Sequence, residues 1–319
     1  MNLIGKNIDH AIALLKQGEL VAIPTETVYG LAGNALNDQA IARIFATKNR
    51  PSFDPLIVHT SSWKRLEKLV KSIPDQAHLL GNAFMPGPLT LLLPKKDLIP
   101  DIVTSGSPIV AVRIPKHPLT LELLEKLPFP LAAPSANPFG YISPTTPAHV
   151  AQQLGDRIPY ILDGGACDVG VESTIVGFAS DQPVIFRKGG IAVEAIEALI
   201  GPVAVKSHST SNPQAPGMLQ SHYAPKVPLQ LGKIDRLLNK FDRTSVGIIS
   251  FQKKYEGVPE KHQVILSETG DFTEAARRLF AGMRYLDSLP LEAILAELLP
   301  EVDLGRAIND RLRRAERVV

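Results

Sequence analysis

Prolines divide this chain more strongly than any other residue type. Its 319 residues include 27 prolines, and 16 of these fall between Pro51 and Pro147. Because proline fixes φ and has no N–H to donate, no long helix or long central strand can pass through this region. Prolines here flank apolar runs such as Leu89–Leu93 and Ile109–Val112, whereas a proline-rich disordered segment would be poor in apolar residues. The pattern predicts short strands joined by rigid loops, which commonly carry binding sites.

Apolar residues recur at both helical and strand spacings, and the two kinds of segment follow each other in mixed order. Asn7 and Asn37 are each expected to cap a helix, because each precedes a segment of helical periodicity. Further helices are predicted over residues 62–70, 75–84, 118–126, 147–154 and 193–200. Strands are predicted over residues 20–23, 56–59, 89–93, 109–113, 131–133, 160–162, 174–178 and 184–187. Since helices and strands do not alternate strictly, the pattern favours an α/β domain with a mixed sheet over a doubly wound fold.

The character of the chain changes after Gly201. From there to Pro228 it holds five prolines, several serines and threonines (Ser207, Ser209, Thr210 and Ser211 among them) and no periodicity, which indicates a linker. Beyond it, strands are predicted over residues 229–231, 246–251 and 264–266, and helices over 234–241, 273–288 and 304–317. We therefore expect an α/β domain over residues 1–200, a linker over 201–228 and a smaller α/β domain over 229–319.

Composition and charge exclude several classes of protein. The one cysteine, Cys167, excludes an internal disulfide framework and a multi-cysteine metal site. The net charge of +2 is too small to indicate nucleic-acid binding by itself, and the five arginines between residues 306 and 317 are expected to form a solvated helix face. No apolar run approaches the roughly 18 residues that span a bilayer, and the first residues lack the apolar core of a signal peptide. A cytoplasmic protein is the expectation.

Common catalytic and nucleotide-binding motifs are absent from the sequence. It contains neither a Walker loop nor a GxGxxG between strand and helix, and no HExxH that would hold a catalytic zinc. It also lacks GxSxG, so Ser135 has no nucleophile elbow. What remains is a series of polar clusters at the ends of predicted strands: PTETVYG (24–30), KNRP (48–51), DPLIVH (54–59), PGPLT (86–90), VRIP (112–115), PSAN (134–137), SPT (143–145), VESTIV (171–176) and RKG (187–189).

Each cluster taken singly has an ordinary structural explanation. Lysine or arginine at a helix C-terminus, as in KNRP, commonly interacts with the helix dipole, and serines in turns commonly cap backbone amides. His59 ends an apolar strand, where a half-buried histidine is common. Arg113 is the exception, because a guanidinium within an apolar strand needs an anionic partner, for which Asp163 and Glu172 are candidates.

Taken together, the clusters indicate a site for anions. They supply four cations and four hydroxyl groups on loops fixed by proline: Lys48, Arg50, Arg113, Arg187, Thr27, Ser135, Ser143 and Ser173. Guanidinium groups bind both phosphate and carboxylate with two parallel hydrogen bonds, so the set suits a triphosphate plus a small carboxylate-bearing molecule. The paired carboxylates of a glycosidase are not among them.

In this order, the clusters closely resemble those of the L-threonylcarbamoyladenylate synthase family, the YrdC-type enzymes of tRNA modification. PTETVYGL, KNRP with PLIVH, PSAN and VESTIV carry the resemblance over residues 8–190. APGM (215–218), HYAP (222–225) and LGRAINDRLRRA (304–315) resemble the longer, two-domain branch of the family, so the resemblance covers nearly the whole chain.

The resemblance implies both a fold and a reaction. The fold is a twisted, mixed-sheet α/β domain of YrdC type with a smaller Rossmann-like α/β domain. The reaction joins L-threonine, bicarbonate or CO2, and ATP into threonylcarbamoyl-AMP and pyrophosphate. A partner transferase complex then passes the threonylcarbamoyl group to the adenosine next to the anticodon of tRNA. Mg²⁺ is expected to arrive on the ATP phosphates rather than in a protein cage.

The resemblance also assigns residues to the two substrates. Threonine would be held by Thr27, His59, Arg113, Ser173 and the backbone at Ala133, with Arg113 paired to its carboxylate. ATP would be contacted by Lys48, Arg50, Asp54, the backbone near Ile109, Ser135, Ser143, Arg187 and Tyr223. Many relatives carry asparagine where Asp54 stands, and a carboxylate there would repel phosphates unless it binds the metal or turns away.

Three questions are open at this stage. The linker is either a lid that places Tyr223 against bound ATP or a segment whose large residues (Met218, Leu219, His222 and Tyr223) only dock the two domains. The chain is either an enzyme or an RNA-binding module without catalysis, with weak tRNA contact possible in both cases. The third question is whether the chain is the carbamoyl-transfer enzyme of hydrogenase maturation, which shares the YrdC-type domain. That enzyme carries CxxC pairs, so the single cysteine of this chain disfavours it.

Overall fold

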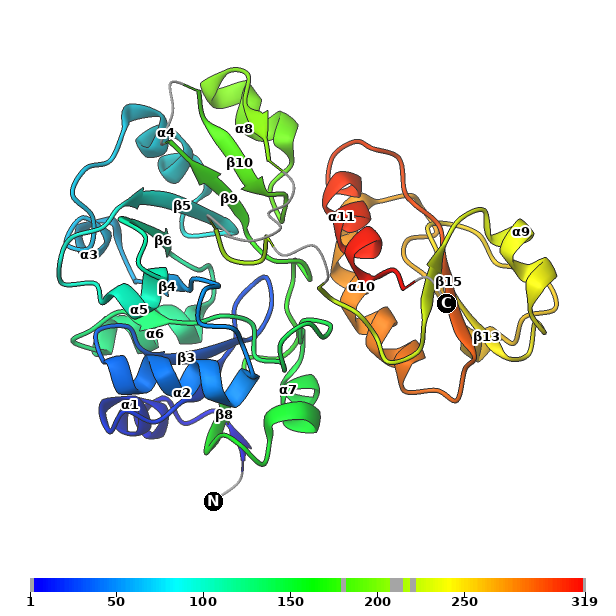
Figure 1. Cartoon of the computed structure of the whole chain (residues 1–319), viewed down its shortest axis with the longest axis horizontal. Helices are drawn as coiled ribbons and strands as arrows, with labels where there is room; N and C mark the ends of the chain where they lie inside the picture. The colour runs from blue at the N-terminus through cyan, green and yellow to red at the C-terminus, as the bar shows by residue number, and fades with distance from the viewer. Residues whose placement is uncertain (1–2, 179–181, 207–214, 219–221, 318–319) are drawn as a thin grey trace.

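Two β-sheets organise the computed structural model, which describes residues 3–178, 182–206, 215–218 and 222–317. Within these residues the larger sheet has eleven strands in the order β1-β8-β2-β3-β7-β4-β6-β5-β9-β10-β11, and the smaller has four in the order β12-β15-β13-β14. We call the two sheets with their helices the first domain and the second domain (Figure 1). The first sheet has parallel and antiparallel neighbours and the second is all parallel, so the expected fold class is confirmed.

The elements of the first domain are short, as its prolines predict. Its strands are β1 (Ile4–Gly5), β2 (Val21–Ile23), β3 (Gly30–Asn34), β4 (Ile57–His59), β5 (Leu89–Pro94), β6 (Ile109–Arg113), β7 (Leu131–Ala132), β8 (Tyr160–Leu162), β9 (Thr174–Gly177), β10 (Val184–Arg187) and β11 (Ala204–Val205). Its helices are α1 (Ile8–Lys16), α2 (Asp38–Lys48), α3 (Trp63–Leu66), α4 (Asp75–Phe84), α5 (Asp101–Thr104), α6 (Pro118–Lys126), α7 (Pro147–Leu154) and α8 (Val193–Ile200).

The predicted helix caps are confirmed. The Asn7 side chain accepts a hydrogen bond from the backbone N of His10 at 3.0 Å, which begins α1. The Asn37 side chain accepts two, from the amides of Gln39 and Ala40, which begins α2. Each bond satisfies an amide that has no carbonyl partner within the helix, so these short polar side chains fix where both helices begin.

The helices cover the two faces of the first sheet unequally. One face packs along its length against α2, α4, α5, α7 and α8, which share one hydrophobic core with inward-facing strand residues. On the opposite face, α1 and α6 cover only one end. At the other end, apolar strand residues such as Ile57 and Phe186 pack against Ala215 and Met218 of the linker (residues 201–228). The middle of this face is therefore free to form a site.

Strand β3, which the sequence did not predict, shows why glycine can stand in a central strand. Gly30 and Gly33 weaken the strand signal of this segment, because glycine has low β propensity. A Cβ at Gly30 would lie 3.1 Å from the Cβ of Ala133, and one at Gly33 would lie 3.0 Å from the side chain of Leu20. The helix predicted over residues 62–70 is also reduced, to α3. In β3, packing and not propensity decides the structure.

The second domain presents its helices to the first. Its strands are β12 (Leu229–Leu231), β13 (Val246–Ser250), β14 (Gln263–Ile265) and β15 (Ala293–Ala296), of which the sequence did not predict β15. Its helices are α9 (Ile234–Leu237), α10 (Phe272–Asp287) and α11 (Gly305–Ala315), with 3-10 turns at Leu238–Lys240 and Glu260–His262. Helices α10 and α11 lie on the side that faces the first domain (Figure 1). Their core is continuous with Val28, Ile142 and Val171 of the first domain.

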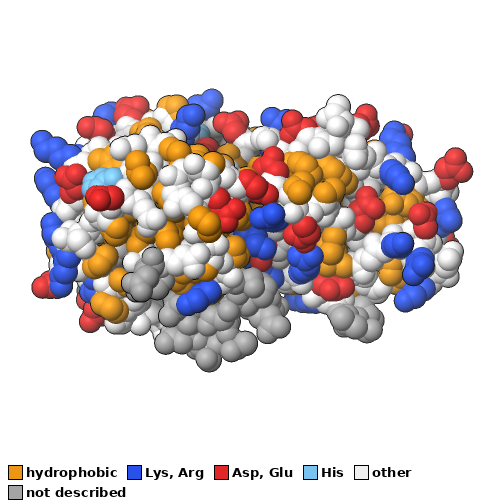
Figure 2. Space-filling model, turned by 90° about the horizontal axis from the view of Figure 1, so that it is seen from above, with side chains coloured by type: hydrophobic (Ala, Val, Ile, Leu, Met, Phe, Trp, Pro, Cys, Tyr) orange, Lys and Arg blue, Asp and Glu red, His pale blue; other side chains and the backbone are white. Residues whose placement is uncertain are grey.

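The face of the molecule in Figure 2 has no large region of one charge. On the face in Figure 2, Lys and Arg side chains alternate with Asp and Glu, and both signs gather where the two domains meet. Among the residues that the structure describes, no helix has the length and apolar content needed to cross a membrane.

Candidate active site

A cavity lies on the partly uncovered face of the first sheet and opens to solvent, with about 580 Å³ of space free of protein atoms when its open mouth is included. Eight of the residues assigned by the sequence line it: Thr27, Arg50, His59, Arg113, Ala133, Ser135, Arg187 and Tyr223. Further lining residues are Thr25, Val28, Gly30, Pro55, Ile57, Pro134, Glu172, Pro216, Gly217 and His222. Residues from about 200 positions of sequence thus meet in one cavity.

Two neighbouring strands place His59 and Arg113 side by side. Strands β4 and β6 are parallel and pair His59 with Arg113, so both side chains lie on the same face. The Nδ1 atom of His59 lies 3.2 Å from the carbonyl oxygen of Ile57. Burial, and then the nearby Arg113, lower the pKa of His59 to about 3. His59 is therefore a neutral hydrogen-bonding group at physiological pH and not a cation.

The anionic partner of Arg113 is Glu26, not Asp163 or Glu172 as the sequence suggested. Arg113 Nη2 lies 2.7 Å from Glu26 Oε1 and donates to Thr27 Oγ1 at 3.0 Å. Glu26 belongs to the loop between β2 and β3, which folds back over the end of β6. Arg113 Nη1 donates to no atom of the described residues, so it is available to a ligand in the cavity.

Arg187 enters the cavity at an irregularity in strand β10. The register of β10 against β9 shifts between Ile185 and Arg187, and such bulges re-aim a side chain. Arg187 donates from Nε to the carbonyl oxygen of Ser173 and from Nη2 to Ser173 Oγ, both at 3.0 Å. Burial lowers the pKa of Arg187 to about 10, so it remains a cation at neutral pH. Ser173 itself stands behind Arg187, with its Oγ 2.7 Å from Thr90 Oγ1.

Asp54 is turned away from the cavity and paired with Arg50. Arg50 Nη2 lies 2.9 Å from Asp54 Oδ2, and both side chains are buried. Arg50 Nε also donates to the Asp54 carbonyl oxygen at 3.1 Å. Arg50 lines the cavity and Asp54 does not, so the carboxylate that would repel phosphates is neutralised behind the guanidinium.

Lys48 does not line the cavity but holds a loop that does. Its Nζ donates to the carbonyl oxygens of Ser135, at 2.5 Å, and of Asn137. Burial and the neighbouring Arg50 hold the pKa of Lys48 well below its usual value. The side chain thus fixes the PSAN loop, whose Ser135 lines the cavity.

Two more of the assigned residues stand outside the lining. Ser143 donates from Oγ to Glu172 Oε1 at 2.6 Å, so it orients a carboxylate that does line the cavity. Ile109, at the start of β6, packs in the apolar group that holds Ala215 and Met218 of the linker. Glu172, the partner of Ser143, therefore lines the cavity, whereas Ser143 and Ile109 do not.

The described part of the linker is docked between the two domains. Tyr223 lines the cavity, and its ring stacks on Phe280 of α10 with centroids 5.4 Å apart. Arg311 and Arg314 lie over the same ring at 5.5 and 4.8 Å. Tyr223 has a φ of 67°, a left-handed conformation that packing must stabilise in a bulky residue. Ser207, Ser209, Thr210, Ser211 and Leu219 lie outside the described residues.

The arginines of α11 do not form one solvated face, contrary to the expectation from the sequence. Arg311 and Arg314 are buried, whereas Arg313 is about half exposed and pairs with Glu301. The helix packs between the domains, and the periodicity of charge alone does not reveal a neighbour that lies more than 100 residues away in sequence. Glu26 and Arg311 thus hold residues of the cavity wall in place, a role that sequence reasoning did not give them although both lie in the quoted motifs. Glu172 lines the cavity and pairs with Arg311, not with Arg113.

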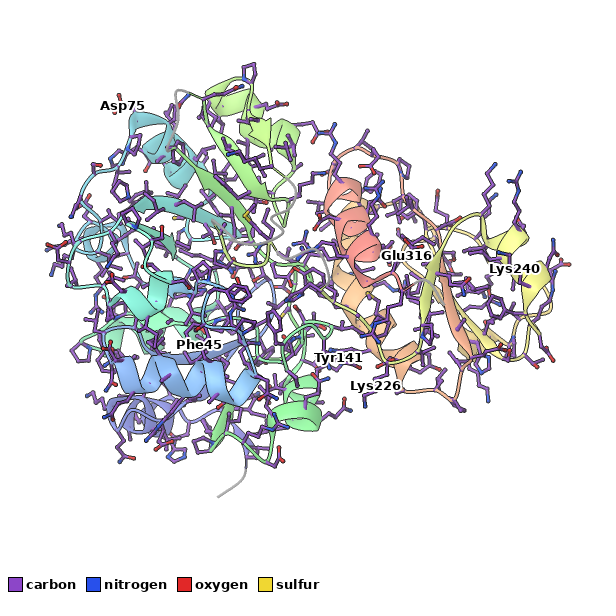
Figure 3. The ribbon with its side chains drawn as sticks, viewed as in Figure 1. Phe45, Asp75, Tyr141, Lys226, Lys240 and Glu316 are labelled. Atoms are coloured by element: carbon purple, nitrogen blue, oxygen red, sulfur yellow. The ribbon has the colours of Figure 1, made fainter. Side chains whose placement is uncertain are left out.

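A second contact between the domains is centred on Tyr141, which Figure 3 labels at their junction. Its hydroxyl donates to Asp287 of α10, and Arg284 lies 5.1 Å over its ring. Arg284 Nε also donates to the carbonyl oxygen of Ser143 at 3.2 Å. Among the described residues, no group of three or more His, Cys, Asp or Glu side chains is placed to hold a metal ion.

Known proteins resemble this chain over almost its whole length. Residues 13–189 match the family described as Telomere recombination, named for Sua5, YciO and YrdC, and residues 191–316 match the one described as Threonylcarbamoyl-AMP synthase, C-terminal domain. The threonylcarbamoyl-AMP synthases of Pyrococcus abyssi and Bacillus subtilis are 42% and 41% identical to it; these alignments cover 96% and 97% of this chain and 92% of each relative. A crystal structure of Pyrococcus abyssi Sua5 complexed with L-threonine superimposes with a TM-score of 0.90 at 39% identity, covering 99% of this chain and 96% of the other.

Proposed function

Because the chain belongs to the threonylcarbamoyl-AMP synthase family, we propose that its cavity binds L-threonine and ATP side by side and joins them. The protein is an enzyme that makes threonylcarbamoyl-AMP and transfers the AMP part of ATP in doing so. The observation that carries the proposal is one cavity with Arg113 beside His59 and, further along its wall, Arg50 and Arg187. One cation suits a carboxylate, and the other two suit phosphates.

The chemistry needs no nucleophile from the protein. The amine of threonine attacks the carbon of CO2, a C–N bond forms, and the proton lost from nitrogen leaves a carbamate. A carbamate oxygen then attacks the α-phosphorus of ATP, a P–O bond forms, and pyrophosphate leaves with the electron pair of the broken P–O bond. Starting from bicarbonate, one water molecule is also released. The protein contributes positioning and charge neutralisation, as in phosphoryl transfer generally.

Threonine is assigned to the part of the cavity around β4 and β6. Arg113 binds its carboxylate through the free Nη1, because Glu26 and Thr27 already hold Nη2. Thr27, neutral His59 and the backbone at Ala133 orient the rest of the molecule. We assign Ser173 to this group as well, acting beside Arg187, to which it is hydrogen-bonded.

ATP is assigned to the remainder of the cavity. Arg50 and Arg187 bind phosphate oxygens, with Ser135 and Tyr223 as further contacts. Lys48, Asp54, Ile109 and Ser143 act here as supports, since each contacts a residue or segment that lines the cavity. Mg²⁺ enters bound to the ATP phosphates, where it neutralises charge and favours departure of pyrophosphate.

The product is a mixed anhydride that water hydrolyses readily, so a consumer must take it up soon after release. We propose a tRNA threonylcarbamoyl transferase complex as that partner and a cytoplasmic setting. Direct contact with tRNA would be weak, because the net charge of the chain is only +2.

Pyrophosphate release tests this function directly. The full-length protein is incubated with ATP and Mg²⁺, and pyrophosphate is measured with threonine and bicarbonate supplied singly, together or not at all. Release only when both are present supports the proposal, whereas release without either one contradicts it. No release under any condition, together with retention of tRNA by an Arg113→Ala variant, would favour the RNA-binding module.

A further inference from the structure

Glu172 is a carboxylate in a cavity whose other charged lining residues within the described chain are cations or neutral histidines. Both of its oxygens are occupied. Oε1 accepts from Ser143 Oγ at 2.6 Å, and Oε2 accepts from Nε and Nη2 of Arg311 at 3.1 and 3.0 Å. Ser143 belongs to the first domain and Arg311 to helix α11 of the second, so this carboxylate bridges the domains.

Arg311 is held as firmly as the carboxylate it binds. Its side chain is fully buried, with Nη1 donating to the carbonyl oxygen of Lys188 at 2.5 Å and to Asp310 Oδ2 at 3.2 Å. The plane of the guanidinium also approaches the ring of Tyr223. A group with so many fixed bonds is not available to a ligand, and it does not line the cavity.

The alternative partner of Glu172 is Arg187. The two side chains line the same cavity, and Arg187 binds the backbone and side chain of Ser173, the next residue after Glu172. Although burial opposes it, Arg311 and then Arg187 hold the pKa of Glu172 below its usual value, so the carboxylate is charged and both cations act on it. Without Arg311, the buried charge would need a new partner, and Arg187 is the cation of the cavity wall that acts on it.

We propose that Arg311 is a positioning residue of the nucleotide site, contributed by the second domain. By holding the carboxylate of Glu172 against Ser143, it keeps that carboxylate from pairing with Arg187. Within the described chain, Nη1 and Nη2 of Arg187 each have one N–H left for phosphate beyond those bound to Pro216 and Ser173. Docking of α11 against the first domain thereby sets the charge of the part of the cavity that binds ATP and leaves the threonine part unchanged. The inference rests on the proposed function, since it assumes that Arg187 faces the nucleotide.

Helix α11 supplies a matched control in the same interface. Arg306 also reaches the first domain, where its Nη2 lies 3.2 Å from Glu194 Oε1. This pair is partly exposed, and neither residue lines the cavity. If the arginines of α11 acted only by joining the domains, replacing Arg306 and replacing Arg311 should change ATP binding in the same way.

The test measures binding of Mg·ATP and of threonine, separately, by calorimetry. Four variants are compared with the wild type: Arg311→Met, which keeps an apolar stem under Tyr223; Glu172→Gln; the double variant; and Arg306→Ala. We expect Arg311→Met to weaken ATP binding about tenfold, within the usual range of coupling between sites, and to leave threonine binding within about twofold. Arg306→Ala should change neither affinity.

The double variant decides between charge and packing. If Glu172 captures Arg187, then adding Glu172→Gln to Arg311→Met should restore ATP affinity to within about threefold of wild type, because an amide does not neutralise a guanidinium. If the double variant binds ATP as weakly as Arg311→Met or more weakly, Arg311 is only structural and the proposal is overturned. An unchanged ATP affinity in Arg311→Met overturns it as well.

Two further outcomes keep the test decisive. Should Arg311→Met fail to fold, Glu172→Gln alone tests the proposal. Unchanged or tighter ATP binding by Glu172→Gln supports it. A loss of ATP affinity of about tenfold or more contradicts it, because the carboxylate itself would then contribute to nucleotide binding. If the wild type binds no ATP, the proposed function fails, which is distinct from a wild type that binds ATP and an Arg311→Met variant that binds it equally.

Discussion

The two ends of the cavity are built in different ways. The end that we assign to threonine takes its polar groups from one domain: Arg113 on β6, neutral His59 on the neighbouring β4 and Glu26 on a loop that returns to β6. The end that we assign to the nucleotide combines Arg187 on β10 with Tyr223 of the linker, and a residue of the second domain, Arg311, holds the carboxylate of Glu172 there.

The difference shows which part of the site depends on the docking of the two domains. A guanidinium fixed by strand pairing and an ion pair within one core keeps its geometry whatever the second domain does. A cavity wall that ends at a domain interface does not, because contacts between domains are fewer and relative motion is the default expectation. The threonine end should therefore respond to changes in the first domain, and the nucleotide end to changes in all three parts of the chain.

The largest effect is expected at Arg113. Arg113→Ala removes the cation assigned to the threonine carboxylate and leaves Glu26 buried without its partner. Threonine binding should weaken by about 2–5 kcal/mol, as for other desolvated charge pairs. Calorimetry should show ATP affinity nearly unchanged, which would separate the two ends.

Two variants sharpen that result. Arg113→Lys should rescue poorly, because an ammonium group does not form two parallel bonds to a carboxylate. Arg43→Ala, at an exposed ion pair with Glu19, is the control and should leave both affinities unchanged. Threonine affinity that survives Arg113→Ala would remove the distinction between the ends.

Selectivity for threonine over serine should come next in size. Val28 and Ile57 are apolar residues in the lining of the cavity, and we expect them to receive the methyl group of threonine. One methyl group in an apolar pocket is worth only ~1–3 kcal/mol, so the preference should be clear but incomplete. The preference is measured from the rates of pyrophosphate release at limiting concentrations of each amino acid. Equal rates would show that the cavity does not distinguish the side chains of threonine and serine.

Acid should destabilise the threonine end through His59. Its pKa in the folded protein is about 3, against an ordinary value near 6.5, so the neutral form is favoured by folding. The stability from this group is complete above about pH 6.5 and is lost as the pH falls toward 3, by about 1.4 kcal/mol per pH unit. Urea unfolding at pH 7.5 and 5.5 should show a smaller loss in His59→Gln than in wild type.

Exposed His78 provides the control for that comparison. His78→Gln should lose as much stability between the two pH values as the wild type does. Half-buried His149 and buried His222 also have lowered pKa values and continue to contribute to acid sensitivity in every variant. If His59→Gln and His78→Gln behave alike, His59 is not held neutral by the fold.

The smallest effect is expected at Tyr223. If the linker is a lid, Tyr223→Ala should lower the yield of intact threonylcarbamoyl-AMP about threefold more than it lowers consumption of ATP, because water reaches the anhydride. Tyr285→Ala, at an exposed tyrosine of α10, should change neither quantity. Equal losses of yield and consumption would mean that the linker only docks the domains, the arrangement in which Tyr223 stacks on Phe280.

Limited proteolysis distinguishes the same two readings without a substitution. A lid predicts that ATP and threonine together protect the linker from cleavage beyond the protection in the free protein. A linker that only docks predicts the same protection with and without ligands.

Local signals in the sequence were enough for much of the fold. Helix α4 and strands β6 and β8 have the predicted bounds, because their apolar periodicity and flanking prolines act within a few residues. The motifs also identified the residues of the cavity wall, since loop residues such as Thr27 and Ser135 stand beside strand ends that the pattern already marks.

Only the tertiary structure decided which charges meet. Glu26 rather than Glu172 pairs with Arg113, and Glu172 pairs with Arg311, which is 139 positions further along the chain. Strand β3 likewise exists because small residues fit against Leu20 and Ala133, not because of propensity. Periodicity reports which face of an element is buried, but the partner of a buried charge depends on how distant segments pack, and that information lies in no local stretch of the sequence.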